Sequence, residues 1–228
     1  MLENPTDSGS RLHISGLDSL DETKKFARKH FNHSQVSHAW DHTLRVYRLC
    51  EIIGPKEGAD MSVLLAAAYL HDIGRSSQDA SNGVICHAQE GARIARPFIW
   101  GLPISRDRKE NIIHCIKAHR FRGHLEPNTI EAKILFDADK LDAIGAIGIA
   151  RAYLFAGEIG ARLHAPDVTI EDSHLYSEND TGFREYRVKL RNIRDRMLTK
   201  AGRRLAADRH VFMENFFKQF IKEYEGER

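Results

Sequence analysis

The sequence is poor in cysteine, and this bounds the class of protein. Only Cys50, Cys86 and Cys115 occur among 228 residues, and no two of them stand in a Cys-x-x-Cys pair. A disulfide framework is therefore excluded, and buried thiols of a reducing compartment are expected.

Long apolar runs and an excess of one charge are also missing. The longest uninterrupted apolar stretch, residues 63–70, is far shorter than the ~20 residues that cross a bilayer. No basic segment followed by an apolar one opens the chain, so no secretory signal is expected. Lys and Arg number 34 and Asp and Glu 32, which gives no strong field toward nucleic acid or membrane. We therefore expect a cytoplasmic protein with neither partner.

What is present is helical periodicity and enough apolar residues for a core. Hydrophobic residues make up 42% of the chain and charged residues 29%, as in ordinary globular domains. Apolar spacing and capping patterns predict helices at residues 19–32, 41–53, 61–74, 88–99, 106–118, from 128 through the DADKLDA stretch, 143–156, 182–198 and 201–225. No strand pattern persists, so we predict a single all-α domain at 18–228 after a loosely ordered extension at 1–17.

Three breaks between these helices are expected. Gly54-Pro55 is expected to end the second helix. Residues 75–83 read as a polar loop. Residues 157–181 are rich in Gly, Pro, Asp, Ser and Asn and predict a long loop, of the kind that often serves as a lid or binding segment.

Histidine is abundant, with 13 copies, and some lie beside carboxylates. His71-Asp72 ends the most apolar helix. A carboxylate buried there needs a cation, a donor or a metal, because burial without a partner costs several kcal/mol. His42 lies upstream in the HAWDHTLRV segment, and Asp137 and Asp139 lie downstream in the DADKLDA segment. Such a set of imidazoles and carboxylates suits manganese, iron, cobalt, nickel or zinc.

The order of these residues resembles a known family. His42, His71-Asp72 and Asp139 match the H…HD…D signature of HD-domain metal-dependent phosphohydrolases. The surrounding HTLRV, AAAYLHDIGR and DADKLDAIGAIGIAR segments, and the carboxyl-terminal helices, look like the small stand-alone bacterial members. The resemblance covers roughly residues 34–225 and implies the helical HD-domain fold.

Carried over to this sequence, the resemblance implies a set of metal ligands. His42, His71, Asp72 and Asp139 would bind the first divalent ion, and Asp72 would also act as general base. Magnesium is possible besides the transition metals. Asp137 is a candidate for orienting a ligating histidine.

The resemblance also suggests a second ion. Some members of the family hold one through two further histidines, and His87 and His119 stand at matching positions. His114 is an alternative to His119. One ion or two are therefore both open. His38 and His174 are weaker candidates for the site, because only sequence spacing or a loop position suggests them.

The implied reaction is hydrolysis of a phosphate ester or anhydride by metal-activated water, with a small nucleotide as the expected substrate. Arg45, Arg75 and Lys140 are candidates to bind the substrate phosphate. Two alternatives remain open: a di-iron oxygenase on the same fold, and a sensor that binds a nucleotide without turning it over. The oligomeric state is open as well.

Overall fold

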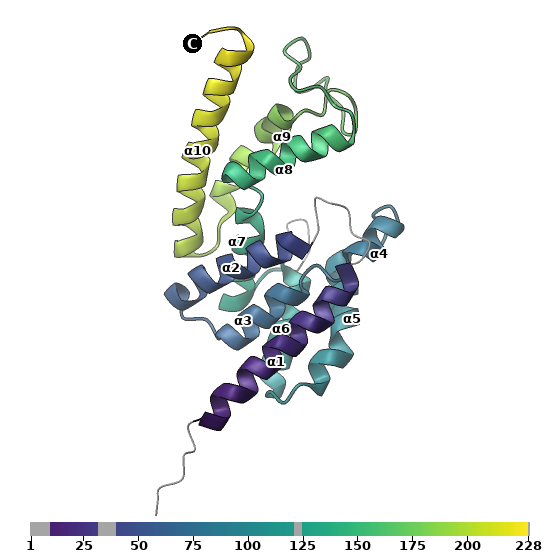
Figure 1. Ribbon diagram of the computed structural model, residues 1–228, viewed down its shortest axis with the longest axis vertical. Coiled ribbons are helices and arrows are strands. Elements are labelled where there is room, and N and C mark those ends of the chain that lie inside the picture. The colour runs from purple at the N-terminus through teal and green to yellow at the C-terminus, as the bar shows by residue number, and fades with distance from the viewer. Residues whose placement is uncertain (1–9, 32–39, 121–124, 228) are drawn as a thin grey trace, which may run out of the picture.

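Helices make up the regular structure throughout the residues that the computed structural model describes, 10–31, 40–120 and 125–227 (Figure 1). The α-helices are α1 Ser10–Arg28, α2 Trp40–Glu57, α3 Met61–Leu70, α4 Arg75–Ala80, α5 His87–Gly101, α6 Arg106–Ala118, α7 Ile130–Leu141, α8 Gly145–Glu158, α9 Gly182–Val188 and α10 Lys200–Tyr224. No strand occurs in these ranges, which confirms the all-α prediction. None of the described helices combines the length and apolarity needed to span a bilayer.

Helix α3 lies at the centre of the first half of the molecule. Helices α1, α2, α6 and α7 pack around it, which explains why its sequence is apolar on nearly every side. Its start is fixed by Asp60, whose carboxylate accepts hydrogen bonds from the backbone N–H groups of Ser62 and Val63. Each large side chain buried here stabilises the fold by about 1.5–3 kcal/mol.

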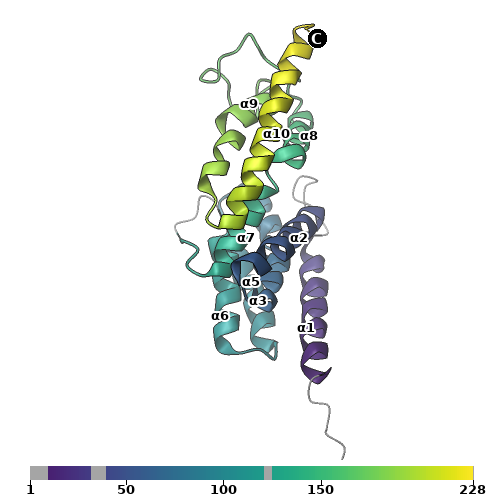
Figure 2. The ribbon, with the colours of Figure 1, turned by 90° about the vertical axis from the view of Figure 1, so that its left-hand side faces the viewer.

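Helices α8, α9 and α10 form a second group, which lies above the first half in Figure 1 and again in the perpendicular view of Figure 2. Helix α10 packs along α8 and also contacts α7 and α2. Its start is tied to α7 by Asp137, whose carboxylate accepts from the backbone N–H groups of Leu198 and Thr199 and from the Thr199 hydroxyl, at 2.7–2.8 Å. Thr199 in turn caps α10 through the N–H of Gly202.

Helix bounds differ from the prediction in five places. Helix α3 ends at Leu70 rather than at Gly74, and residues 71–74 form a turn. Helix α1 begins at Ser10 rather than at residue 19, because extending a formed helix costs far less than starting one. Helix α2 continues through Pro55 to Glu57. A proline near a helix end removes only one backbone donor, and little helix remains beyond it to be disrupted. The division into residues 1–17 and 18–228 remains a prediction.

The other two differences concern irregular segments. Residues 75–83 were expected to be loop, but Arg75–Ala80 form the short helix α4, which packs against α5. Helix α4 has only six residues, and its polar sequence has no apolar periodicity, so the sequence pattern could not indicate a helix there. The helix expected over residues 182–198 ends at Val188, because Lys189 leaves the helical region with φ −133° and ψ −57°, and two 3₁₀ turns follow. The long segment after α8 is non-helical through residue 181, as expected.

Gly74 permits the turn after α3 to lie directly against the start of α5. A Cβ atom at this position would lie 2.3 Å from the carbonyl oxygen of His87 and 2.5 Å from the amide nitrogen of Gly91. Both are backbone atoms, which cannot rotate away. The contact therefore holds two segments together that both carry histidines of the predicted site.

We expect Gly74→Ala to lower the free energy of unfolding by about 1–3 kcal/mol, because overpacking forces the backbone to shift. Urea unfolding followed by circular dichroism measures the change. Gly101→Ala is the matched control: no atom lies within 4 Å of its added Cβ, so its stability should be equal to or above that of the parent. Equal stability of the two variants would contradict the packing argument.

Candidate metal centre

The turn that follows α3 carries His71 and Asp72, both almost fully buried. His42, in the first turn of α2, and Asp139, in the last turn of α7, approach them. The Nε2 atom of His42 lies 3.3 Å from Nε2 of His71, 3.4 Å from Oδ1 of Asp139 and 3.7 Å from Oδ2 of Asp72. The four residues of the predicted first ion site therefore converge, although they come from two helices and the turn after a third.

A second pair of histidines lies on the other side of Asp72. His87 begins α5 and His119 ends α6, and their Nε2 atoms are 3.1 Å apart. The Oδ1 atom of Asp72 lies 3.5 Å from Nε2 of His87 and 3.6 Å from Nε2 of His119. Its Oδ2 atom faces His42 and His71. The carboxylate thus lies between two histidine pairs, one at each oxygen.

Oxygen atoms hold the outer nitrogen, Nδ1, of all four rings. His71 and His119 each donate from Nδ1 to a carbonyl oxygen three residues earlier, at 2.8 and 2.6 Å. A carbonyl only accepts, so the proton of these neutral rings is on Nδ1. Nδ1 of His87 lies 2.8 Å from Oε1 of Gln78, and Nδ1 of His42 lies 2.7 Å from Oδ2 of Asp142. Nε2 of each ring therefore faces inward, where it meets the other histidine of its pair and, for His87, Nη2 of Arg75 at 3.3 Å.

This donor set fits a divalent metal ion. Ligand atoms about 2.0–2.2 Å from one ion lie roughly 2.8–3.1 Å from their neighbours in octahedral geometry and roughly 3.3–3.6 Å in tetrahedral geometry. The distances between the Nε2 atoms of the two histidine pairs fall in these ranges. The groups His42, His71, Asp72 and Asp72, His87, His119 each place their ligand atoms within 4.8 Å of one another.

Two positively charged side chains contact the carboxylates of the centre. Arg75 places Nη2 3.0 Å from Oδ1 of Asp72, and Lys140 places Nζ 2.6 Å from Oδ2 of Asp139. Burial opposes the ionisation of both carboxyls, but the nearby cations outweigh it, and the pKa values of Asp72 and Asp139 lie well below their usual range. Both side chains are therefore ionised at neutral pH and available to a cation.

The histidines divide into two kinds by pKa. Burial disfavours the charged form of His42, but its hydrogen bonds to Asp139 and Asp142 prevail and raise its pKa to about 9. Burial lowers the pKa of His71 to about 4 and that of His87 to about 2. His71 and His87 are thus neutral at pH 7, as metal ligands must be, whereas His42 must lose its proton before Nε2 can bind an ion.

Asp142 is a part of the centre that the sequence interpretation missed. Its carboxylate accepts from Nε of Arg45 at 2.6 Å, from Nη1 of Arg151 at 2.8 Å and contacts Nδ1 of His42. It therefore orients His42, the role expected for Asp137. The signal was present in the sequence, because Asp142 follows Asp139 by three residues and so lies one turn further along the same side of the chain.

Asp137 does not take the expected part in the centre. It points away from the histidines and binds the backbone before α10. Helical residues two apart face different sides, so Asp137 and Asp139 serve different neighbours. Arg45 is held by Asp142 and Asp41, the latter at 2.6 Å, and its assignment to substrate remains a prediction.

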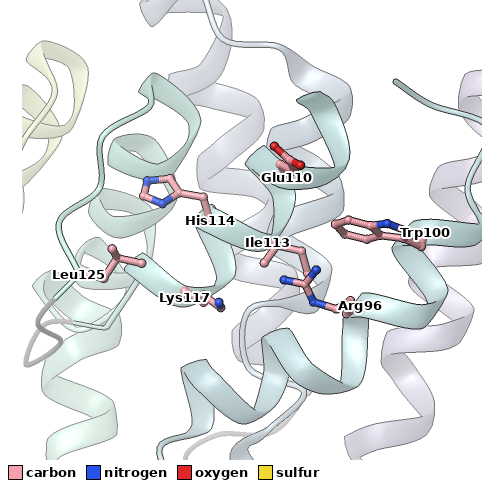
Figure 3. Close-up of a pocket in the computed structure, with 7 residues that line it drawn as sticks. All are labelled: Arg96, Trp100, Glu110, Ile113, His114, Lys117 and Leu125. Carbon is pink, nitrogen blue, oxygen red and sulfur yellow. The ribbon is translucent and has the colours of Figure 1, made fainter. Parts of the chain in front are cut away.

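The remaining histidine candidates lie elsewhere or outside the described residues. His114 lines a separate pocket between α5 and α6 (Figure 3), where its Nε2 accepts the backbone N–H of Asn128 at 3.0 Å. It is thus not part of the cluster that contains His119. His38 falls outside the described ranges, and His174 is exposed in the segment after α8.

Comparison with known proteins gives the family. The model of the HD domain matches residues 39–144, the stretch that holds all the residues of the centre. The Bacillus subtilis protein YpgQ is 31% identical over 218 residues, which are 92% of this chain and 96% of YpgQ. The chain therefore belongs to the HD-domain superfamily.

Solved structures extend the likeness to nearly the whole chain. The crystal structure of YpgQ in complex with ADP has a TM-score of 0.71 at 29% identity and covers 92% of this chain and 96% of that one. An HD-superfamily hydrolase of Bacillus thuringiensis has a TM-score of 0.73 at 27% identity, with 92% and 98% covered. Ribonuclease Y of Sulfurovum is 30% identical over 144 residues, 62% of this chain but only 26% of that enzyme. The protein is thus an HD-superfamily hydrolase that resembles the small members along their full length.

We expect Asp142→Ala to weaken the binding of Mn²⁺ about 10–100-fold, because His42 loses the acceptor that orients it. Isothermal titration calorimetry on metal-stripped protein measures the affinity.

Asp137→Asn is the control for a general loss of stability. It removes an acceptor from the start of α10 and should lower the free energy of unfolding by about 1–3 kcal/mol, while Mn²⁺ affinity stays unchanged. Equal losses of Mn²⁺ affinity in the two variants would contradict a specific role for Asp142.

Proposed function

We propose that this protein is a metal-dependent phosphohydrolase that cleaves a phosphate ester or anhydride of a small nucleotide. The observation that carries the proposal is the position of the Asp72 carboxylate between two histidine pairs whose Nε2 atoms face each other at 3.3 and 3.1 Å. The choice of a nucleotide as substrate is supported by YpgQ, which was crystallised with ADP, and by the side chains around the centre.

His42, His71, Asp72 and Asp139 would hold one divalent ion, and His87, His119 and Asp72 a second. Manganese, iron, cobalt, nickel and zinc suit this set of nitrogen and oxygen ligands, and magnesium is an alternative. When bound, such an ion lowers the pKa of water toward ~7 and polarises a phosphoryl oxygen.

The protein's own residues supply the rest of the chemistry. The family resemblance gives Asp72 the role of general base as well as ligand, and its ionised carboxylate lies between both histidine pairs. Arg75 and Lys140 lie at the two ends of the cluster and neutralise its carboxylates. When cations engage those carboxylates, the two side chains would turn to the negative oxygens of the phosphoryl group, as phosphoryl transfer requires.

Helix α8 offers an apolar surface beside the centre. Arg151 reaches Asp142, and Ile147 and Leu154 flank it at helical spacings of four and three residues. They are 42% and 44% exposed, which is high for large apolar side chains. A substrate with a base or sugar next to its phosphates would find an apolar contact there, and this supports a nucleotide over inorganic polyphosphate.

We expect Mn²⁺ or Co²⁺ to stimulate release of phosphate or pyrophosphate from at least one nucleoside phosphate, and Asp72→Ala and His71→Ala to abolish it. The loss should exceed the ~10–100-fold that removal of an outer hydrogen-bond partner causes, because these residues are ligands themselves. Malachite-green detection with and without added pyrophosphatase distinguishes the two products.

The alternatives give different results in the same panel. Full metal-stimulated turnover in Asp72→Ala would overturn the proposal. Turnover only with iron and dioxygen would point to the oxygenase. Tight nucleotide binding without any product in the parent protein would point to a sensor.

We expect two Mn²⁺ ions per chain in the parent protein and one in His87→Ala, because the second pair loses a ligand while the first stays complete. Equilibrium dialysis with elemental analysis gives the number. His174→Ala, which removes an exposed histidine, should keep two ions. A single ion in the parent that His87→Ala leaves in place would restrict the centre to His42, His71, Asp72 and Asp139.

A further inference from the structure

A separate pocket of about 330 Å³ lies between α5 and α6 (Figure 3). It is lined by Arg96, Trp100, Glu110, Ile113, His114, Lys117 and Leu125, and none of the residues of the metal centre is among them. Its volume is at the lower end of the range for small-molecule sites, ~300–1,000 Å³.

Positively charged and donor groups gather in this pocket. Within the part of the chain that the structure describes, neither Arg96 nor Lys117 forms an ion pair. His114 accepts at Nε2 from Asn128, so in its neutral form the proton is on Nδ1, which is a further donor. Glu110 is the carboxylate of the pocket, and it is already paired with Arg106 at 2.8 Å. The pocket therefore brings two positively charged side chains and a histidine donor together with one carboxylate, an arrangement that suits an anion.

An aromatic ring forms one wall. Trp100 is 41% exposed, and the guanidinium of Arg96 lies 4.7 Å from the centre of its ring. Figure 3 places Trp100 and Arg96 on α5, across the pocket from His114 and Lys117 on α6. A flat ring can stack on an exposed indole or on an arginine plane. A ligand that combines an aromatic ring with a phosphate satisfies both walls at once.

The two helices that form the pocket also carry the second histidine pair. Helix α5 begins at His87, and α6 ends at His119. Lys117 precedes His119 by two residues, and His114 precedes it by five. A ligand that bridges α5 and α6 therefore acts on the elements that set the 3.1 Å separation of the two Nε2 atoms.

We propose that this pocket is a regulatory site for a nucleoside monophosphate, and that its occupancy changes the affinity of the His87–His119 pair for its ion. The ligand binds through stacking on Trp100 and through its phosphate on Arg96, Lys117 and His114. The regulatory half of the proposal rests on the proposed function, whereas the binding half does not.

Binding is tested with AMP in EDTA, with fluorescence of Trp100 as the signal. The chain holds two tryptophans, so Trp40→Phe leaves Trp100 as the only reporter. AMP should change the emission, and adenosine or inorganic phosphate alone should bind at least about 10-fold more weakly. Equal affinity for phosphate and AMP would reduce the site to a phosphate site and overturn the proposal. If Trp40→Phe fails to fold, dialysis of labelled AMP against the parent chain replaces the fluorescence.

Charge-reversal variants test whether AMP binds in this pocket or elsewhere on the molecule. Lys117→Glu and Arg96→Glu should each weaken AMP binding at least about 10-fold, whereas Lys218→Glu, the same change at an exposed position of α10, should leave it unchanged. His71→Ala should also leave it unchanged, since that residue belongs to the metal centre. AMP binding that survives Lys117→Glu, or disappears in His71→Ala, overturns the assignment to this pocket.

Coupling is tested by titrating Mn²⁺ with and without saturating AMP. In the parent protein, AMP should shift the affinity of the Mn²⁺ site that His87→Ala removes roughly 5-fold or more, and the shift should vanish in Lys117→Glu. AMP binding at Trp100 without any shift overturns the regulatory role. Absent turnover with the AMP response intact would overturn the hydrolase proposal and leave this site standing.

Discussion

The buried charge of Asp72 is the constraint on which the centre depends. A carboxylate without solvent is stable only if positive charge or donors surround it. Here Arg75 lies 3.0 Å away, and four imidazoles direct Nε2 toward its two oxygens from 3.5 to 3.9 Å. The arginine and the imidazoles compensate the charge of the buried carboxylate. The pKa of His42 is raised for a related reason, because its hydrogen bonds to the carboxylates of Asp139 and Asp142 favour the protonated ring.

The geometry of the rings is set by atoms outside the cluster. The carbonyl groups that hold His71 and His119 belong to the last turns of α3 and α6, where carbonyls lack intrahelical donors. A helix end thus becomes an anchor for a ligand, since an otherwise unsatisfied acceptor fixes the tautomer of the ring. Gln78 of α4 does the same for His87. The contact between Gln78 and His87 therefore helps to stabilise the short polar helix α4, which lacks buried apolar residues.

Much of the fold and of the metal centre could be predicted from the sequence. The features that could not be predicted escaped for different reasons. The long amphipathic helices and the order of His42, His71-Asp72 and Asp139 are local patterns, and the structure brings these four residues together. The role expected for Asp137 belongs to Asp142, because sequence gives the spacing of carboxylates along a helix and not the partner that each one meets. Helix α4 and the end of α9 at Lys189 depend on contacts with distant segments, which no local periodicity records.

The last turns of α7 face two parts of the molecule. On one side Asp137 secures the start of α10, and two residues later Asp139 enters the cluster. The carboxyl-terminal arm is thus fastened to the very segment that presents a ligand. Because one backbone segment serves both, complete detachment of the arm would also release the segment that presents Asp139, whereas loss of a single hydrogen bond at Asp137 would not. Such a chain would tolerate truncation of its arm poorly, even though the arm contributes no atom to the cluster.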